Sequence, residues 1–150
     1  LNKLNIFAQH ADNIDVGTLI DIFRDDENSC LLGTDAVRDG IDVPGRSLRL
    51  LICDKVPWPR PNILHKARKV DFKNSNVDHN YDDILVRLKL KQAFGRLIRK
   101  NTDHGVFVML DKAMPSRLKS AFPDNINIQR LTLSETVSET KKFVFKQNEY

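Results

Sequence analysis

Two arginines and a glutamine lie at helical spacing in the stretch Gln92-Ala-Phe-Gly-Arg-Leu-Ile-Arg99. If this stretch is helical, Gln92, Arg96 and Arg99 fall within an arc of about 60°, with the apolar residues on the other side. Gly95 borders the polar arc and leaves room for close approach. Each guanidinium offers a planar fork of donors, so two arginines one turn apart suit a chain of phosphates. Taken alone, the stretch also fits an exposed helix with ordinary surface arginines.

A second candidate is a loop rich in Gly, Thr and Asp, which runs from Gly33 to Gly45 after a short apolar run. Open α/β sheets bind ligands in such loops, at the carboxyl ends of their parallel strands. Thr34 and nearby backbone N–H groups could hold a phosphate group. Asp42 could accept a hydrogen bond from a ribose or order a network of catalytic water. A plain connection, with Gly40 and Gly45 in turns, is the alternative interpretation.

The elements that must position these residues alternate between strands and helices. Short apolar runs predict strands at 4–8, 29–32, 48–53, 105–110 and 126–133. Helical patterns predict helices at 16–24 with Asp15 as N-cap, at 82–100, at 115–122, and at 134–145 with Ser134 as N-cap. The alternation predicts an α/β fold with a mostly parallel sheet and helices on both faces. The proline-containing segment 57–80 is expected to be a long excursion from this sheet.

Size and composition limit the class of protein. The 150 residues, 41% of them apolar, predict one domain with a core. No apolar run is long enough to span a membrane, so no membrane partner is expected. The cysteines, Cys30 and Cys53, lie in expected strands and fit a reducing cytoplasm better than a disulfide framework or a zinc site. The histidines share no ligand spacing, so no metal site is expected. A first residue other than Met suggests a fragment.

Charge is distributed unevenly along the chain. Residues 1–45 carry 3 Lys/Arg and 9 Asp/Glu, a net charge of −6, whereas residues 46–100 carry 14 and 5, a net charge of +9. A basic middle beside an acidic start suggests an anionic partner on one face. A solvated basic surface explains the same charges equally well.

The order of these stretches resembles that of DinG/XPD-type superfamily 2 DNA helicases, and bacterial DinG-like proteins more closely than XPD. The loop from Gly33-Thr34 to Asp39-Gly40-Ile41-Asp42-Val43-Pro44-Gly45 resembles helicase motif V, and Gln92 to Arg99 resembles motif VI, Q-x-x-G-R-x-x-R. The segment 103–111 resembles the strand after motif VI, and 56–61 resembles the proline-rich segment after motif V. The resemblance covers residues 29–115 and implies that 1–150 is the C-terminal RecA-like domain of such a helicase.

The resemblance also implies a role for each candidate residue. In these helicases the first RecA-like domain holds ATP and Mg²⁺, and the second supplies arginines across the cleft. Arg99 is then expected to be the arginine finger, Arg96 a second phosphate contact and Gln92 a polar partner at the nucleotide. The nucleotide state would be coupled to the grip on DNA through two motif V residues, Gly40 and Asp42. Thr34 and Arg38 would contact the backbone of single-stranded DNA. Many members of the family have aromatic residues at the positions that Val37 and Arg38 occupy here.

Two motifs that ATP hydrolysis requires are missing from the sequence. It contains no G-x-x-x-x-G-K-[ST] pattern and no DEAH-like acidic box, so the isolated chain is expected to be inactive. The full-length protein would be the ATP-dependent DNA helicase. One alternative is a non-enzymatic nucleic-acid-binding module on a RecA-like scaffold. A nuclease is another alternative, for which Asp39 and Asp42 are the only close carboxylate pair in a candidate site.

Overall fold

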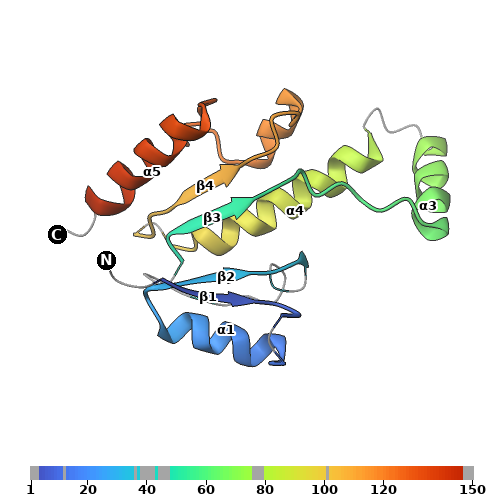
Figure 1. Cartoon of the computed structure of the whole chain (residues 1–150). Coiled ribbons are helices and arrows are strands. Elements are labelled where there is room, and N and C mark those ends of the chain that lie inside the picture. Colours follow the sequence, from blue (N-terminus) through green and yellow to red (C-terminus); the bar gives the residue numbers. More distant parts are fainter. Residues whose placement is uncertain are drawn as a thin grey trace.

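The computed structural model describes residues 4–11, 13–35, 37, 43, 48–75, 80–100 and 102–146. The elements follow one another in the order β1 (Asn5–Ala8), α1 (Val16–Asp25), β2 (Ser29–Leu32), β3 (Leu50–Cys53), α3 (Ile63–Asn74), α4 (Tyr81–Leu97), β4 (Val106–Met109), the 3-10 helix η2 (Ser116–Ala121) and α5 (Leu133–Lys146) (Figure 1). Among the described residues, no helix combines the length and the apolar character that crossing a membrane requires.

The strands are parallel, as predicted. Strand β1 pairs with β2, with Asn5 opposite Ser29, and β3 pairs with β4, with Leu50 opposite Val106. Within the described part of the chain these are two separate two-stranded pairs. Helix α1 lies along the first pair, and α4 and α5 lie on opposite sides of the second (Figure 1). The α/β class with parallel strands and helices on both faces is therefore confirmed.

Helix α4 carries the apolar core on one face. Its buried residues recur every three or four positions: Asp83, Val86, Leu90, Ala93 and Leu97. Near its N-terminus it packs against Val56 and η2, and near its C-terminus it packs with α1 in a cluster that includes Ile20, Phe23 and Val43. The helix thus joins two core clusters, and its other face is left for contacts outside the core.

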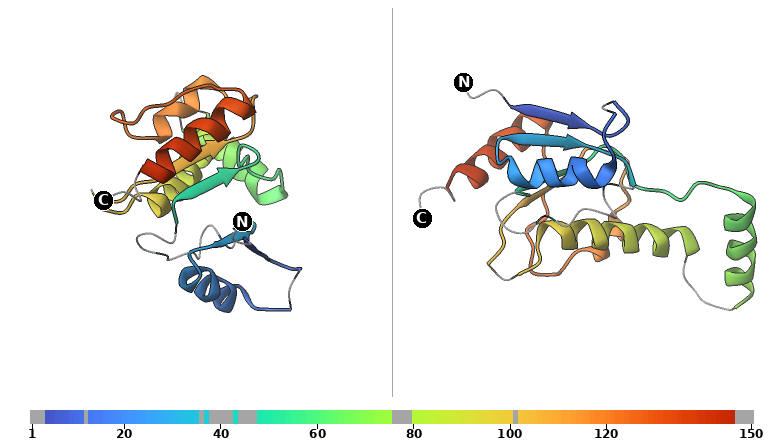
Figure 2. Two further views of the ribbon diagram at one scale, coloured as in Figure 1. Left: turned by 60° about the vertical axis from the view of Figure 1, so that its left-hand side comes forward. Right: turned by 90° about the horizontal axis from the view of Figure 1, so that it is seen from below.

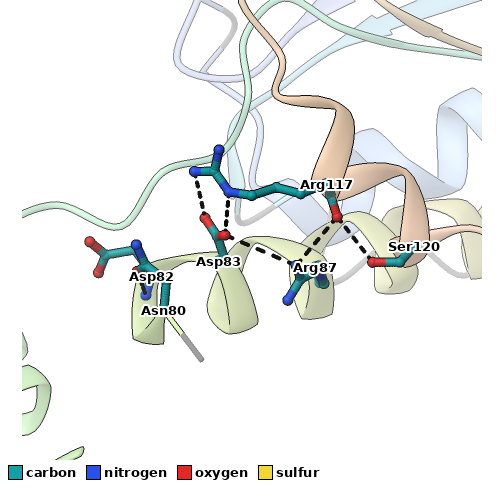
Figure 3. Close-up of polar contacts among 6 residues, drawn as sticks. All are labelled: Asn80, Asp82, Asp83, Arg87, Arg117 and Ser120. Carbon is teal, nitrogen blue, oxygen red and sulfur yellow. Dashed lines mark hydrogen bonds and ion pairs between the residues drawn. The ribbon is translucent and has the colours of Figure 1, made fainter. Parts of the chain in front are cut away.

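An ion pair fixes the first half of α4 to η2 (Figure 3). The Asp83 carboxylate, only 4% exposed, accepts hydrogen bonds from Arg117 Nε at 2.5 Å and from Arg117 Nη2 at 3.1 Å. Arg87 Nη2 lies 4.0 Å from the same carboxylate and donates to the Arg117 carbonyl at 3.3 Å. These contacts with Arg117 lower the pKa of Asp83 below its usual value, and the same hydrogen bonds raise the pKa of Arg117.

The excursion after β3 contains a helix that was not predicted. Helix α3 begins after Asn62, whose side chain accepts the N–H of His65 at 2.7 Å, and it has no buried residue. It stands away from the rest of the molecule in Figure 1 and in the right-hand view of Figure 2. It reaches the start of α4 through Phe72, whose ring centroid lies 5.3 Å from that of Tyr81, and through the Lys69–Asp82 ion pair.

The strand predicted at 126–133 is wrong. Residues 127–132 form no regular structure, and α5 already begins at Leu133. Thr132 and Glu135 form a capping box: Thr132 N–H donates to Glu135 Oε2 at 2.8 Å, and Glu135 N–H donates to Thr132 Oγ1 at 3.3 Å. Thr132, rather than the predicted Ser134, is therefore the N-cap of the last helix. Of the apolar residues before it, Ile126 is half-buried, whereas Ile128 and Leu131 are exposed, so their alternation does not mark a strand.

Candidate functional site

An open surface pocket lies at the C-terminal end of α4. It has a volume of about 360 Å³ and is lined by Gln92, Gly95, Arg96 and Arg99. The structure therefore brings together the glutamine and the two arginines that the sequence analysis selected as phosphate-binding residues. An amide and two guanidiniums around one hollow fit a polyphosphate, because all three groups donate hydrogen bonds and two carry positive charge.

Gly95 keeps one side of this pocket open. Among the described residues, leaving aside its two chain neighbours and the helix's own backbone, a Cβ placed on Gly95 would meet no atom within 4 Å. The prediction that Gly95 leaves room for close approach is thus confirmed. Glycine inside a helix costs stability relative to alanine, and no packing contact among the described residues requires it here.

Arg99 does not lie on the helix, which corrects the prediction that the helix extends to residue 100. Helix α4 ends at Leu97, and Ile98 has an extended backbone with φ −121° and ψ 105°. Asp103 competes for the backbone groups that would continue the helix: its Oδ2 accepts the N–H groups of Arg99 and Lys100, each at 2.8 Å. The Arg99 hydrogen bond, followed by that of Lys100, lowers the pKa of Asp103. Arg99 reaches the pocket from this turn and not from the helical face.

Close packing holds the end of α4 in place. Leu97 is 3% exposed and belongs to the core cluster that contains Val43, with Ile98 packed against the same cluster. The Leu97 side chain also packs against Gly105, where an added Cβ would come 2.5 Å from Leu97 Cδ1. Leu97 and Ile98, which lie between Arg96 and Arg99 in the sequence, are therefore anchored in the core.

The loop after β2 meets the chain just after β1. Gln9 Oε1 accepts hydrogen bonds from the backbone N–H of Thr34 at 2.8 Å and from its hydroxyl at 2.9 Å. The sequence analysis missed Gln9, although the parallel pairing of β1 with β2 places the two strand ends together. Both donors of Thr34 are engaged in this way. For Thr34 to donate to a phosphate, its hydrogen bonds to Gln9 must therefore first break.

The two candidate stretches also touch each other. Val43, 1% exposed, lies in the same core cluster as Leu97, and Lys89 Nζ of α4 lies 3.6 Å from Asp35 Oδ2 of the loop. Within the loop, a Cβ on Gly33 would come 2.3 Å from Val37 Cγ2, so glycine is needed there. Three further predicted loop residues lie outside the described residues: Arg38, Gly40 and Asp42.

The end of β4 is tied to the proline-rich segment by Asp111. Its carboxylate accepts the N–H of Val56 at 3.2 Å and that of Ala113 at 3.0 Å. Val56 is buried against α4 and η2. Asp111 thus has a structural role within the described part of the chain.

Cysteines and other ligand-type residues do not gather near the pocket. Cys30 and Cys53 lie in β2 and β3, as predicted, and are half-buried free thiols. Across the ranges that the structure describes, no group of three His, Cys, Asp or Glu residues is arranged to hold a metal ion.

Comparison with known proteins decides the family. The sequence profile of the helicase C-terminal domain matches residues 1–129. The chain belongs to the helicase C-terminal domain family. This membership confirms the resemblance seen in motifs V and VI and agrees with a RecA-like arrangement of parallel strands and helices.

Several curated relatives of this helicase C-terminal domain are named helicases. The chain is 37% identical over 100 residues to the ATP-dependent helicase DinG of Mycobacterium tuberculosis, covering 65% of this chain and 15% of the relative. It is 37% identical over 105 residues to the ATP-dependent DNA helicase YoaA of Haemophilus influenzae, covering 67% and 16%. It is 26% identical over 153 residues to the 3'-5' exonuclease DinG of Bacillus subtilis, covering 97% and 16%. No solved structure gives a significant match.

Proposed function

We propose that this helicase C-terminal domain is the second motor domain of an ATP-dependent DNA helicase that translocates on single-stranded DNA. The observation that carries the proposal is the pocket in which Gln92, Gly95, Arg96 and Arg99 meet at the end of α4. The chain spans about 15% of the length of relatives such as the mycobacterial DinG. The rest of the motor, including a first RecA-like domain that holds ATP and Mg²⁺, would belong to the full-length protein.

The pocket residues would act on the nucleotide from across the interdomain cleft. Arg99 is proposed as the arginine finger, which stabilises the charge that develops on the transferring phosphoryl group. Arg96, one helical turn after Gln92, would be a second phosphate contact, and Gln92 would hydrogen-bond at the nucleotide. The open space over Gly95 would let the first domain and its nucleotide approach the helix closely.

The loop after β2 would carry the contact to DNA. Thr34 and Arg38 are proposed to bind the phosphates of single-stranded DNA, and Gly40 and Asp42 to couple the nucleotide state to this grip. Contacts of this kind carry little sequence information and weaken with salt. The Lys89–Asp35 ion pair and the shared core cluster support the coupling, because they join the loop to the helix that carries the pocket.

The alternative of a non-enzymatic nucleic-acid-binding module predicts no ATP hydrolysis by the full-length protein. A nuclease activity would need metal ligands, and the described residues contain no such group. The name of the Bacillus relative speaks of exonuclease activity, but only 16% of that protein matches this chain.

Hydrolysis and unwinding assays on the full-length protein test the proposal. We expect ATP hydrolysis that single-stranded DNA stimulates, and ATP-dependent unwinding of a duplex with a single-stranded tail. The 150-residue chain by itself should hydrolyse no ATP, because it lacks a phosphate-binding loop sequence. Full-length protein that binds DNA but hydrolyses no ATP would favour the binding module instead.

A further inference from the structure

The two pocket arginines are held by different parts of the structure. Arg96 lies in the last turn of α4, so the helix sets its direction. Arg99 follows Ile98, whose N–H makes the hydrogen bond that ends the helix, to the Phe94 carbonyl at 3.0 Å. The helical hydrogen bonds therefore do not determine where Arg99 points.

Hydrogen bonds to Asp103 fix the backbone at Arg99 instead. Asp103 Oδ2 accepts the N–H groups of both Arg99 and Lys100 at 2.8 Å. In return, the Asp103 N–H donates to the Lys100 carbonyl at 3.0 Å. Three hydrogen bonds thus join Arg99 and Lys100 to Asp103, and one carboxylate oxygen fixes the peptide plane that precedes the Arg99 side chain.

Packing on the far side of the turn restricts it further. Gly105, two residues after Asp103, lies against Leu97. A Cβ added to Gly105 would come within 2.5 Å of Leu97 Cδ1 and 3.2 Å from the Arg49 carbonyl oxygen. The N–H of Val106 donates to that carbonyl at 2.9 Å as β4 begins. The turn is therefore held between the end of α4 and the start of β4.

We infer that Asp103 is a positioning residue for Arg99: its carboxylate aims the proposed finger into the pocket without touching the nucleotide itself. The inference rests on the proposed function of Arg99. Displacement of a catalytic group by about 1 Å can cost on the order of 100-fold in rate. Loss of the carboxylate should therefore slow ATP hydrolysis while leaving the binding of ATP, which the first domain dominates, almost unchanged.

The matched control is Asp15, a second aspartate that accepts backbone and side-chain hydrogen bonds in a local turn. Its Oδ1 accepts the N–H of Thr18 at 3.1 Å at the start of α1, and its hydrogen bonds with Thr18 lower its pKa as those with Arg99 and Lys100 lower that of Asp103. Asp15 does not line the pocket. Asp15→Ala should remove a comparable hydrogen bond to a backbone N–H and leave kcat unchanged.

The test is the DNA-stimulated ATPase of the full-length protein in five forms: unmodified, Asp103→Ala, Asp103→Asn, Arg99→Ala and Asp15→Ala, together with the double variant Asp103→Ala/Arg99→Ala. We expect Asp103→Ala to lower kcat by about 10- to 100-fold with the KM for ATP within about twofold. Asp103→Asn, which keeps an acceptor oxygen, should recover part of the loss. The double variant should be no slower than Arg99→Ala, because Asp103 acts through Arg99.

Three results would overturn the inference, and they are distinguishable. If Arg99→Ala is slow but Asp103→Ala matches Asp15→Ala, Asp103 does not position Arg99 and the proposed function still stands. An additive loss in the double variant would likewise show that Asp103 acts independently of Arg99. If Arg99→Ala hydrolyses ATP at the unmodified rate, the proposed role of Arg99 fails and the inference fails with it.

Discussion

The side chain of Leu97 occupies the space beside Gly105, so that a Cβ on Gly105 would come within 2.5 Å of Leu97 Cδ1 and 3.2 Å of the Arg49 carbonyl. Leu97 is almost fully buried and cannot move aside freely. Gly105→Ala is therefore expected to lower the free energy of unfolding by about 1–3 kcal/mol, as overpacking of a core does. Urea denaturation of the 150-residue chain measures this, and an unchanged midpoint would contradict it.

Gly95→Ala should have the opposite effect on stability and a separate effect on activity. Apart from its chain neighbours and the helix's own backbone, the part of the chain that the structure describes has no atom within 4 Å of the added Cβ. Alanine is favoured over glycine inside a helix, so the free energy of unfolding should rise by about 0.5–1 kcal/mol. In the full-length protein the same methyl group would project from the helix at the pocket and hinder close approach, so the DNA-stimulated ATPase rate should fall about 10-fold or more. A variant that is more stable and fully active would show that nothing approaches the helix there.

The Asp83–Arg117 pair predicts a pH-dependent contribution to stability. Because the pKa of Asp83 is lowered in the folded chain, the unfolded chain binds its proton first as pH falls. The stabilisation is therefore complete above the unfolded pKa of about 4 and is lost as pH falls through the folded pKa.

Asp83→Asn isolates this contribution. It should lower the free energy of unfolding by about 1–3 kcal/mol near neutral pH, and the difference from the unmodified chain should shrink in acid. Thermal unfolding over a pH series measures it, with Asp124→Asn, an exposed aspartate, as the control. A difference that stays constant from neutral to acid pH would refute this account of the ion pair.

The Gln9–Thr34 contact predicts how DNA affinity responds to two substitutions in the full-length protein. Thr34→Val removes the hydroxyl that we propose binds a phosphate, so affinity for single-stranded DNA should fall about 3- to 10-fold. Gln9→Leu removes the acceptor that now engages Thr34, so affinity should rise. Fluorescence anisotropy with a labelled oligonucleotide at constant salt tests both. Equal affinity in all three proteins would remove Thr34 from the DNA site.

Sequence patterns predicted those parts of the fold that depend on neighbouring residues. The bounds of β2 and the Asp15 cap of α1 are as expected, because a short apolar run and an N-cap are local features. The parallel pairing was also predicted from the alternation of strands with helices. Of the site, the sequence placed Gln92, Arg96 and Arg99 together on one helical face; in the structure the three line one pocket, although Arg99 lies beyond the helix.

Other features could not be predicted, because they depend on contacts across the turn or between strands. Helical periodicity continues through Arg99, and only the hydrogen bonds to Asp103 show that the helix ends before it. Gln9 reaches Thr34 because β1 and β2 are paired, which spacing along the chain does not reveal. Helix α3 has no buried residue, so it lacks the apolar periodicity by which helices are recognised.

The central claim is that Arg99 reaches the nucleotide from the turn after α4. The most direct measurement is DNA-stimulated ATP hydrolysis by the full-length protein with and without Arg99→Ala. Arg24→Ala is the control, because Arg24 is a partly exposed arginine that pairs with Asp21 on α1. Arginine fingers accelerate hydrolysis by about 10³- to 10⁵-fold. We predict that Arg99→Ala lowers the rate by at least about 100-fold while ATP binding persists. Hydrolysis at the unmodified rate in Arg99→Ala would contradict the account.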